Sequence, residues 1–194
     1  MLDFIFLIGT SGVGKSTLAK RLMETLQSTC IEQHMVPEFL TRDGVEAMTG
    51  EMEETTCYEV TRAMALCFQK LGYRNIIVTD LDDLRTREIP MAFRGFRYLT
   101  LKLICTDPAE LQSRMAGREN GLVDYELQRK LSEKMLSRPL MVNEQLLDTT
   151  GLDEEQVLQK ALEILESFKP ETEYEYHLPP REWFYSWVPS RGLR

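Results

Sequence analysis

Short apolar runs alternate along the chain with longer stretches of helical periodicity. Residues 4–8 (FIFLI) form a continuous apolar run, which is typical of a strand buried on both faces. Residues 15–27 then repeat leucine at helical spacing. The sequence IEQHMV, which ends at Pro37, fits a second strand. The chain therefore opens with a strand, a helix and a strand.

The same alternation continues to residue 168. A long amphipathic helix is predicted over residues 53–71. Further strands are predicted at residues 75–80, 99–106 and 143–151. Asp107 and Asp153 are predicted N-caps of two more helices. Strands that alternate with helices indicate an α/β fold, a three-layer sandwich with a parallel five-stranded sheet.

Ligands of such sheets bind at the carboxyl ends of the strands. Gly9, Asp80 and Asp148 each fall at the end of a predicted strand. We therefore expect these three residues at one edge of the sheet, where a ligand would lie.

The stretch FLIGTSGVGKSTLAKRL places the pattern G-x-x-x-x-G-K-S between the first strand and the first helix. Glycines let the backbone turn so that its N–H groups converge on a phosphate, and the helix start adds partial positive charge. The motif therefore predicts a nucleoside triphosphate site, with ATP as the expected nucleotide. Its predicted binding residues are Gly9, Thr10, Ser11, Gly12, Val13, Gly14, Lys15, Ser16 and Thr17.

Two side chains of this loop carry specific chemistry. The ammonium group of Lys15 reaches the β- and γ-phosphates and stabilises charge as the γ-group moves. The hydroxyl of Ser16 is a hard oxygen ligand, as Mg²⁺ prefers. The loop therefore predicts Mg²⁺ as a second cofactor.

Composition narrows the kinds of partner. The formal net charge is −8, which argues against binding to nucleic acid or to a membrane surface. The four cysteines show no C-x-x-C spacing, and no cluster of them with His34 or His177 indicates a zinc site. No secretory signal and no apolar stretch of membrane-spanning length is visible. We expect a cytoplasmic protein with reduced thiols.

Missing motifs narrow the class of phosphate-loop protein. There is no N-K-x-D segment and no D-x-x-G at a strand end, as a GTPase switch should have. There is also no L-S-G-G-Q signature of an ABC-type ATPase, and a motor or AAA module needs more chain. A small domain with this loop and no switch signature favours a phosphotransferase.

Three segments resemble the adenylate-kinase-like group of small P-loop kinases, which includes nucleotide, gluconate, shikimate and polynucleotide kinases. They are LTRDGVEAM, IIVTDLDDLRTRE and LQSRMAGRE, and the resemblance covers roughly residues 4–168. It implies the P-loop NTP hydrolase fold. It also implies that Asp43 acts on the acceptor hydroxyl and that Asp80 faces Mg²⁺ and the phosphates, with Asp82 and Asp83 as rivals.

The same resemblance implies a lid near residues 114–140, whose arginines close over the transferring group. Arg118 is the predicted catalytic arginine, and Arg114 and Asp148 are placed with the nucleotide. Alternatives stay open, because Asp43 before Gly44 is also an ordinary turn pair and either arginine could be a solvated helix charge. An anionic acceptor could instead be held by Arg85, Arg87, Arg94 or Arg97.

The acceptor segment departs from the known branches. The loop GTSGVGKST is close to that of guanylate kinases, but their T-T-R-x-P-R-x-G-E segment is absent. The D-G-x-P-R of adenylate kinases and the D-R-S of thymidylate kinases are also missing. The donor site is therefore better defined by the sequence than the acceptor site.

The last stretch of the chain has a different character. Residues 1–169 are predicted to form the kinase domain, and residues 170–194 a proline- and aromatic-rich arm. The arm either lies over its own domain or contacts a partner or a second copy. We expect an ATP- and Mg²⁺-dependent kinase for a small acceptor, such as a nucleoside, nucleotide or sugar-like compound. The alternatives are an ATP-binding regulatory protein and a guanylate-kinase-like nucleotide kinase.

Overall fold

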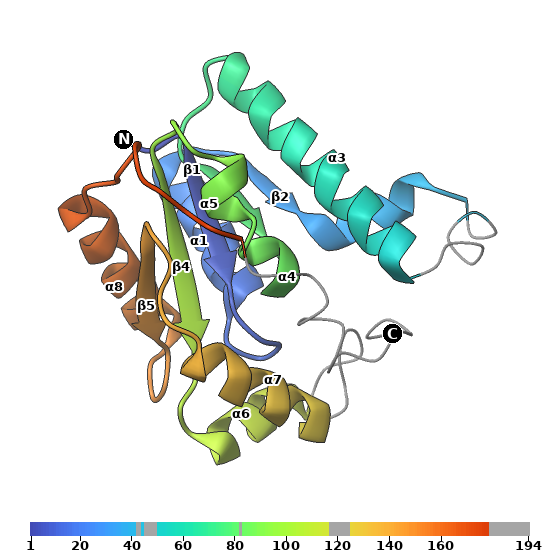
Figure 1. Ribbon diagram of the computed structural model, residues 1–194. Coiled ribbons are helices and arrows are strands. Elements are labelled where there is room, and N and C mark those ends of the chain that lie inside the picture. The colour runs from blue at the N-terminus through green and yellow to red at the C-terminus, as the bar shows by residue number, and fades with distance from the viewer. Residues whose placement is uncertain (42–43, 45–49, 82, 117–124, 179–194) are drawn as a thin grey trace.

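A computed structural model describes residues 1–41, 44, 50–81, 83–116 and 125–178. Within them, five parallel strands form one sheet in the order β2-β3-β1-β4-β5 (Figure 1). The strands are β1 Phe4–Ile8, β2 Cys30–Glu32, β3 Ile76–Thr79, β4 Tyr98–Ile104 and β5 Glu144–Asp148. The predicted α/β class and parallel five-stranded sheet are confirmed.

Helices lie on both faces of this sheet (Figure 1). They are α1 Lys15–Leu26, the 3₁₀ helix η1 Gln33–Phe39, α3 Gly50–Lys70, α4 Asp83–Thr86, α5 Ile89–Ala92, α6 Pro108–Met115, α7 Tyr125–Ser137 and α8 Glu154–Ser167. One core joins α1 and α8 to side chains such as Leu7 and Leu101. The other joins α3 and α5 to side chains such as Phe4 and Phe6. The three-layer prediction is therefore confirmed.

The register brings the strand ends to one edge. In β1, Leu7 pairs with Thr79 and Ile8 pairs with Lys102. In β4, Ile104 pairs with Asp148. The residues that follow β1, β3 and β4 therefore leave the sheet side by side, at the edge where ligands of such sheets bind.

Both predicted N-caps are confirmed. The carboxylate of Asp107 accepts hydrogen bonds from the backbone N–H groups of Ala109 and Glu110, at 2.8 and 3.3 Å. The carboxylate of Asp153 accepts from the backbone of Gln156, whose side chain in turn accepts from the backbone N–H of Asp153. These bonds satisfy donors that a helix start leaves unpaired.

The predicted second strand is only partly right. IEQHMV was expected to be extended, but β2 ends at Glu32 and η1 occupies residues 33–39. In the part of the chain that the structure describes, this strand lies at the sheet edge and pairs only with β3, so few ladder bonds hold the chain extended. The turn of η1 buries Val36. Helix α7, which falls in the predicted lid region, was not predicted as a helix.

The described part of the arm, residues 170–178, lies over its own domain (Figure 1). The hydroxyl of Tyr174 donates to the carbonyl of Pro90 at 2.6 Å and lies 3.0 Å from the hydroxyl of Tyr98. Asn143 and Glu171 exchange two hydrogen bonds, at 2.7 and 2.8 Å. This segment is therefore an integral part of the fold. Within the described chain, no helix combines the length and apolar character that a membrane crossing needs.

Candidate nucleotide and cation site

The phosphate loop packs tightly against the sheet. Gly9 follows β1 with a φ of 148°, a conformation that residues with side chains rarely adopt. A Cβ atom on Gly9 would lie 2.6 Å from the carbonyl oxygen of Leu103 and 2.8 Å from Cγ2 of Val13. Glycine at this position therefore lets the loop turn directly over β4.

The loop ends at the start of α1. The first turn of α1 contains no acidic side chain, and no side-chain hydrogen bond caps it. The exposed backbone N–H groups and the helix dipole therefore favour an anion at this end. Ser16 and Thr17 are half-buried in this first turn.

Lys15 connects the loop to the end of β3. Its ammonium group donates to the carbonyl of Thr10 at 3.1 Å and lies 3.7 Å from Oδ1 of Asp80. Asp80 itself has a φ of 65°, a left-handed conformation that turns the chain sharply at the strand end. The structure thus brings together two of the predicted catalytic residues.

A third residue at this corner, His34, was not predicted from the sequence. Its Nδ1 lies 2.8 Å from Oδ2 of Asp80 and 3.5 Å from Oε2 of Glu32. Cysteine and histidine spacing could not find this cluster, because two of its three members are carboxylates at the ends of two different strands. The available signal was a polar pair at the end of a strand, Glu32 as its last residue and His34 two residues later, at the same edge as the end of β3.

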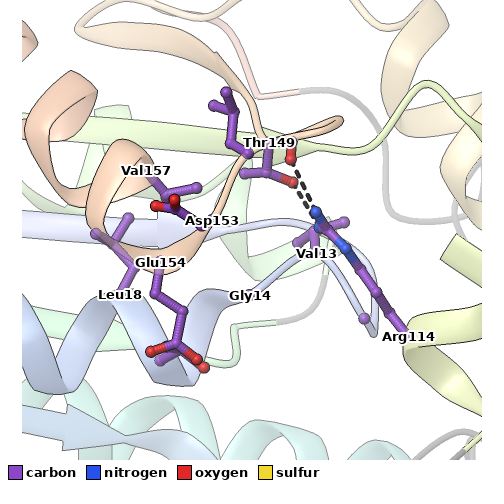
Figure 2. Close-up of a pocket in the computed structure, with 11 residues that line it drawn as sticks. Val13, Gly14, Leu18, Arg114, Thr149, Asp153, Glu154 and Val157 are labelled. Carbon is purple, nitrogen blue, oxygen red and sulfur yellow. Dashed lines mark hydrogen bonds between the residues drawn. The ribbon is translucent and has the colours of Figure 1, made fainter. Parts of the chain in front are cut away.

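A pocket of about 360 Å³ opens beside the phosphate loop (Figure 2). Its lining residues are Gly12, Val13, Gly14, Thr17, Leu18, Arg114, Thr149, Leu152, Asp153, Glu154 and Val157. The pocket lies between the loop and the start of α8. Apolar walls with a few polar groups are typical of small-molecule sites.

Arg114 lies on the rim of this pocket and is held in place (Figure 2). Its guanidinium donates to the hydroxyl and the carbonyl of Thr149, at 2.9 and 2.8 Å, and to Glu110 at 2.5 Å. The guanidinium therefore connects α6 to the loop after β5. It is a positioned group and not a solvated helix charge.

Among the described residues, Thr149 lines the pocket and the neighbouring Asp148 does not. The carboxylate of Asp148 accepts from the N–H and the hydroxyl of Thr150, at 3.0 and 2.6 Å. Partial burial by itself raises the pKa of Asp148, but hydrogen bonds from Thr150 and Thr106 and the charge of Lys160 bring it below its usual value. Asp148 therefore braces the loop that carries Thr149.

Helix α7 contacts the phosphate loop with neutral side chains. The amide of Gln128 donates to the carbonyl of Ser11 at 2.7 Å, and the hydroxyls of Ser132 and Thr10 lie 2.9 Å apart. Arg129 is half-buried and paired with Glu126 and Glu133 of its own helix. No arginine of the described part of α7 is thus shown facing the loop. The predicted residues Arg118, Asp43 and Asp82 lie outside the described residues.

Two of the arginines proposed for an anionic acceptor, Arg85 and Arg94, have other contacts. Arg85 is 1% exposed and donates to both oxygens of Glu88, at 2.9 and 3.0 Å, and to Glu54. Its guanidinium also lies 4.8 Å from the ring centre of Tyr58. Arg94 pairs with Glu173 of the arm. Arg85 therefore fixes α3 against α4, which favours a structural role.

Solved structures similar to this chain share its fold. A sugar kinase from Janibacter sp. HTCC2649 is 16% identical, with a TM-score of 0.61 over 86% of this chain and 95% of that one. Thymidylate kinase from Candida albicans is 19% identical, with a TM-score of 0.58 over 84% of this chain and 91% of that one. The Deinococcus radiodurans tunicamycin resistance protein is 16% identical, with a TM-score of 0.65 over 88% of this chain and 99% of that one.

The protein has the α/β fold of P-loop nucleoside triphosphatases, as found in small P-loop kinases. This follows from the order of the strands, the glycine loop and the similarity to these solved structures. The sequence profile of the AAA_18 family, described as an AAA domain, matches residues 5–134, and the chain belongs to this family. The expectation that an AAA module needs more chain is therefore wrong for this family. No curated protein matches the chain.

Proposed function

We propose that this protein is an ATP- and Mg²⁺-dependent kinase that transfers the γ-phosphoryl group to a small metabolite. The observation that carries the proposal is the position of Lys15, between the loop carbonyl of Thr10 and the carboxylate of Asp80. A lysine at the end of a glycine loop and an acid at the next strand end are the parts that phosphoryl transfer needs. The sugar, thymidylate, gluconate and shikimate kinases among the similar folds support this reading.

The nucleotide would lie along the loop with its base in the 360 Å³ pocket. Arg114 and Thr149 line one side of that pocket, and Leu18 and Val157 provide apolar surface. The phosphates would then meet the backbone N–H groups of the loop and the start of α1. Arg114, fixed by Thr149 and Glu110, contributes a planar cation that can stack on the base.

In the proposed reaction, an oxygen of the acceptor attacks the γ-phosphorus. The bond from that phosphorus to the bridging β–γ oxygen breaks, and ADP leaves with the electron pair. Lys15 moves from Thr10 and Asp80 to the phosphates and stabilises the charge that develops there. Catalysis is mostly positioning and charge stabilisation.

The donor chemistry of two side chains fits Mg²⁺. The hydroxyl of Ser16 and the carboxylate of Asp80 are both hard oxygen donors. When bound, the ion would neutralise phosphate charge. These assignments are part of the proposal, as is the role of Asp148 as a brace on the nucleotide side.

The acceptor is proposed to be a nucleoside, a nucleotide or a sugar-like compound. Asp43 would orient or deprotonate an acceptor hydroxyl, and for a phosphate acceptor it would only position the group. Arg118 would close over the transferring phosphoryl from the lid near residues 114–140. These two roles rest on the resemblance of their segments to small P-loop kinases.

Residues 1–169 are proposed as the kinase domain and residues 170–194 as the arm. The net charge of −8 and the buried thiols of Cys57 and Cys105 support a cytoplasmic protein that acts on small molecules, without a membrane or nucleic-acid partner. A homodimer or partner contact would involve arm residues other than those packed on the domain.

A phosphoryl-transfer screen tests the proposal. The full-length chain is incubated with γ-labelled ATP and Mg²⁺ against nucleosides, nucleotides and sugar acids. Lys15→Ala is the test variant and Lys20→Ala the matched control, because Lys20 is exposed on the same helix. We expect label on at least one acceptor with the wild type and the control, and loss of at least about 100-fold with Lys15→Ala. Equal transfer by Lys15→Ala would exclude this loop as the catalytic site.

A further inference from the structure

The ends of β2 and β3 bring one histidine and two carboxylates together beside Lys15. The atoms Glu32 Oε2, His34 Nδ1 and a carboxylate oxygen of Asp80 all lie within 4.8 Å of one another. We propose that Glu32, His34 and Asp80 directly bind a first-row divalent transition cation, such as Mn²⁺ or Zn²⁺, in preference to Mg²⁺. The chain would hold this cation without nucleotide.

The spacing of the donor atoms fits a metal ion. With metal–ligand bonds of about 2.1 Å, two ligands at a right angle are about 3.0 Å apart, and two tetrahedral ligands about 3.4 Å apart. His34 Nδ1 lies 2.8 Å from the Asp80 oxygen and 3.5 Å from the Glu32 oxygen. Both distances from His34 therefore lie within a few tenths of an ångström of these ligand spacings.

Local structure explains why these three side chains converge. Glu32 pairs with Thr79, so that the residue after Thr79 leaves the sheet beside the end of β2. The left-handed φ of 65° at Asp80 turns the chain at this point. The change from strand to 3₁₀ helix after Glu32 places His34 at the same corner. The site is thus built by the two strand ends and the turn of η1.

The negative charges at this corner favour a bound cation. Glu32 and Asp80 are both mostly buried, with side chains 18% and 23% exposed, and their like charges lie close together. The ammonium of Lys15 lies 3.7 Å from Asp80. This cation is proposed for the chain without nucleotide, whereas the Mg²⁺ role of Asp80 in the proposed reaction applies when nucleotide is bound.

The imidazole nitrogen determines which metal is favoured. Mg²⁺ binds oxygen ligands almost exclusively and keeps several waters. Imidazole ligands suit later first-row metals, whose affinity for a given site rises from Mn²⁺ towards Cu²⁺. A site with one nitrogen and two carboxylate oxygens therefore selects against Mg²⁺. Coordination through Nδ1 of His34 leaves the imidazole proton on Nε2.

The test is a titration of the full-length protein with Mn²⁺ alone, with free Mn²⁺ followed by electron paramagnetic resonance. His34→Ala is the test variant. His177→Ala is the matched control, because the chain has two histidines and His177 is exposed on the arm. We expect one Mn²⁺ per chain for the wild type and the control, and affinity at least about tenfold weaker for His34→Ala.

Two further measurements sharpen the result. Glu32→Gln should also weaken Mn²⁺ binding by about tenfold, and Mg²⁺ should displace Mn²⁺ only at about tenfold molar excess or more. Equal binding by wild type and His34→Ala, displacement by equimolar Mg²⁺, or no binding at about 1 mM Mn²⁺ would each overturn the proposal. Because no nucleotide is present, these outcomes are independent of whether the chain is a kinase.

Discussion

Gly9→Ala tests whether the phosphate loop must pack directly on β4. The new Cβ would lie 2.6 Å from the carbonyl oxygen of Leu103 and 2.8 Å from a methyl group of Val13. Both neighbours are in the buried core, so relief requires the loop to move away from the sheet. Overpacking of this kind costs about 1–3 kcal/mol. A side chain at φ 148° adds backbone strain of about 1–3 kcal/mol.

Gly72→Ala separates the two costs. Gly72 follows α3 with a φ of 97°, and nothing lies within 4 Å of its ideal Cβ, so only backbone strain should appear. We therefore expect urea unfolding to give a free energy about 1–3 kcal/mol lower for Gly9→Ala than for Gly72→Ala. Gly9→Ala should also weaken ATP binding, whereas Gly72→Ala should not. Equal stability of the two variants would refute the proposed contact between loop and strand.

Three further changes test other parts of the account. Tyr174→Phe removes the hydrogen bond to Pro90, and we expect about 1–2 kcal/mol lower stability in urea, with no loss for the exposed Tyr73→Phe. Asp107→Ala removes the N-cap of α6 and should cost about 1 kcal/mol in the same assay. The lowered pKa of Asp148 contributes stability above its unfolded pKa that is lost as pH falls through the folded value. Below about pH 4, the free energy of unfolding should therefore depend less steeply on pH for Asp148→Asn than for the wild type.

Features fixed by neighbouring residues were predicted well from sequence. The loop from Gly9 to Ser16, the strand before it and the caps at Asp107 and Asp153 depend on contacts within a few residues. Apolar runs also predicted the buried strands, because central parallel strands are covered on both faces. The position of Asp80 followed from the same reasoning.

Features made by distant segments could not be predicted. His34 and Asp80 are 46 residues apart in sequence, and no periodic pattern connects them. Gln128 meets Ser11 across 117 residues, so the contact of α7 with the phosphate loop had no local signal. The strand that ends at Glu32 was predicted to be longer than it is. Its place at the sheet edge depends on the topology, which the local sequence does not show. Asp43 and Arg118 stay predictions.

The most direct test of the central claim is the fate of labelled phosphate in a reaction with the full-length protein. With γ-labelled ATP, we predict transfer of label to a small acceptor, and with α-labelled ATP we predict that the label stays in ADP. Lys15→Ala should abolish the transfer and Lys20→Ala should keep it. Failure to label any acceptor, or undiminished transfer by Lys15→Ala, would contradict the account.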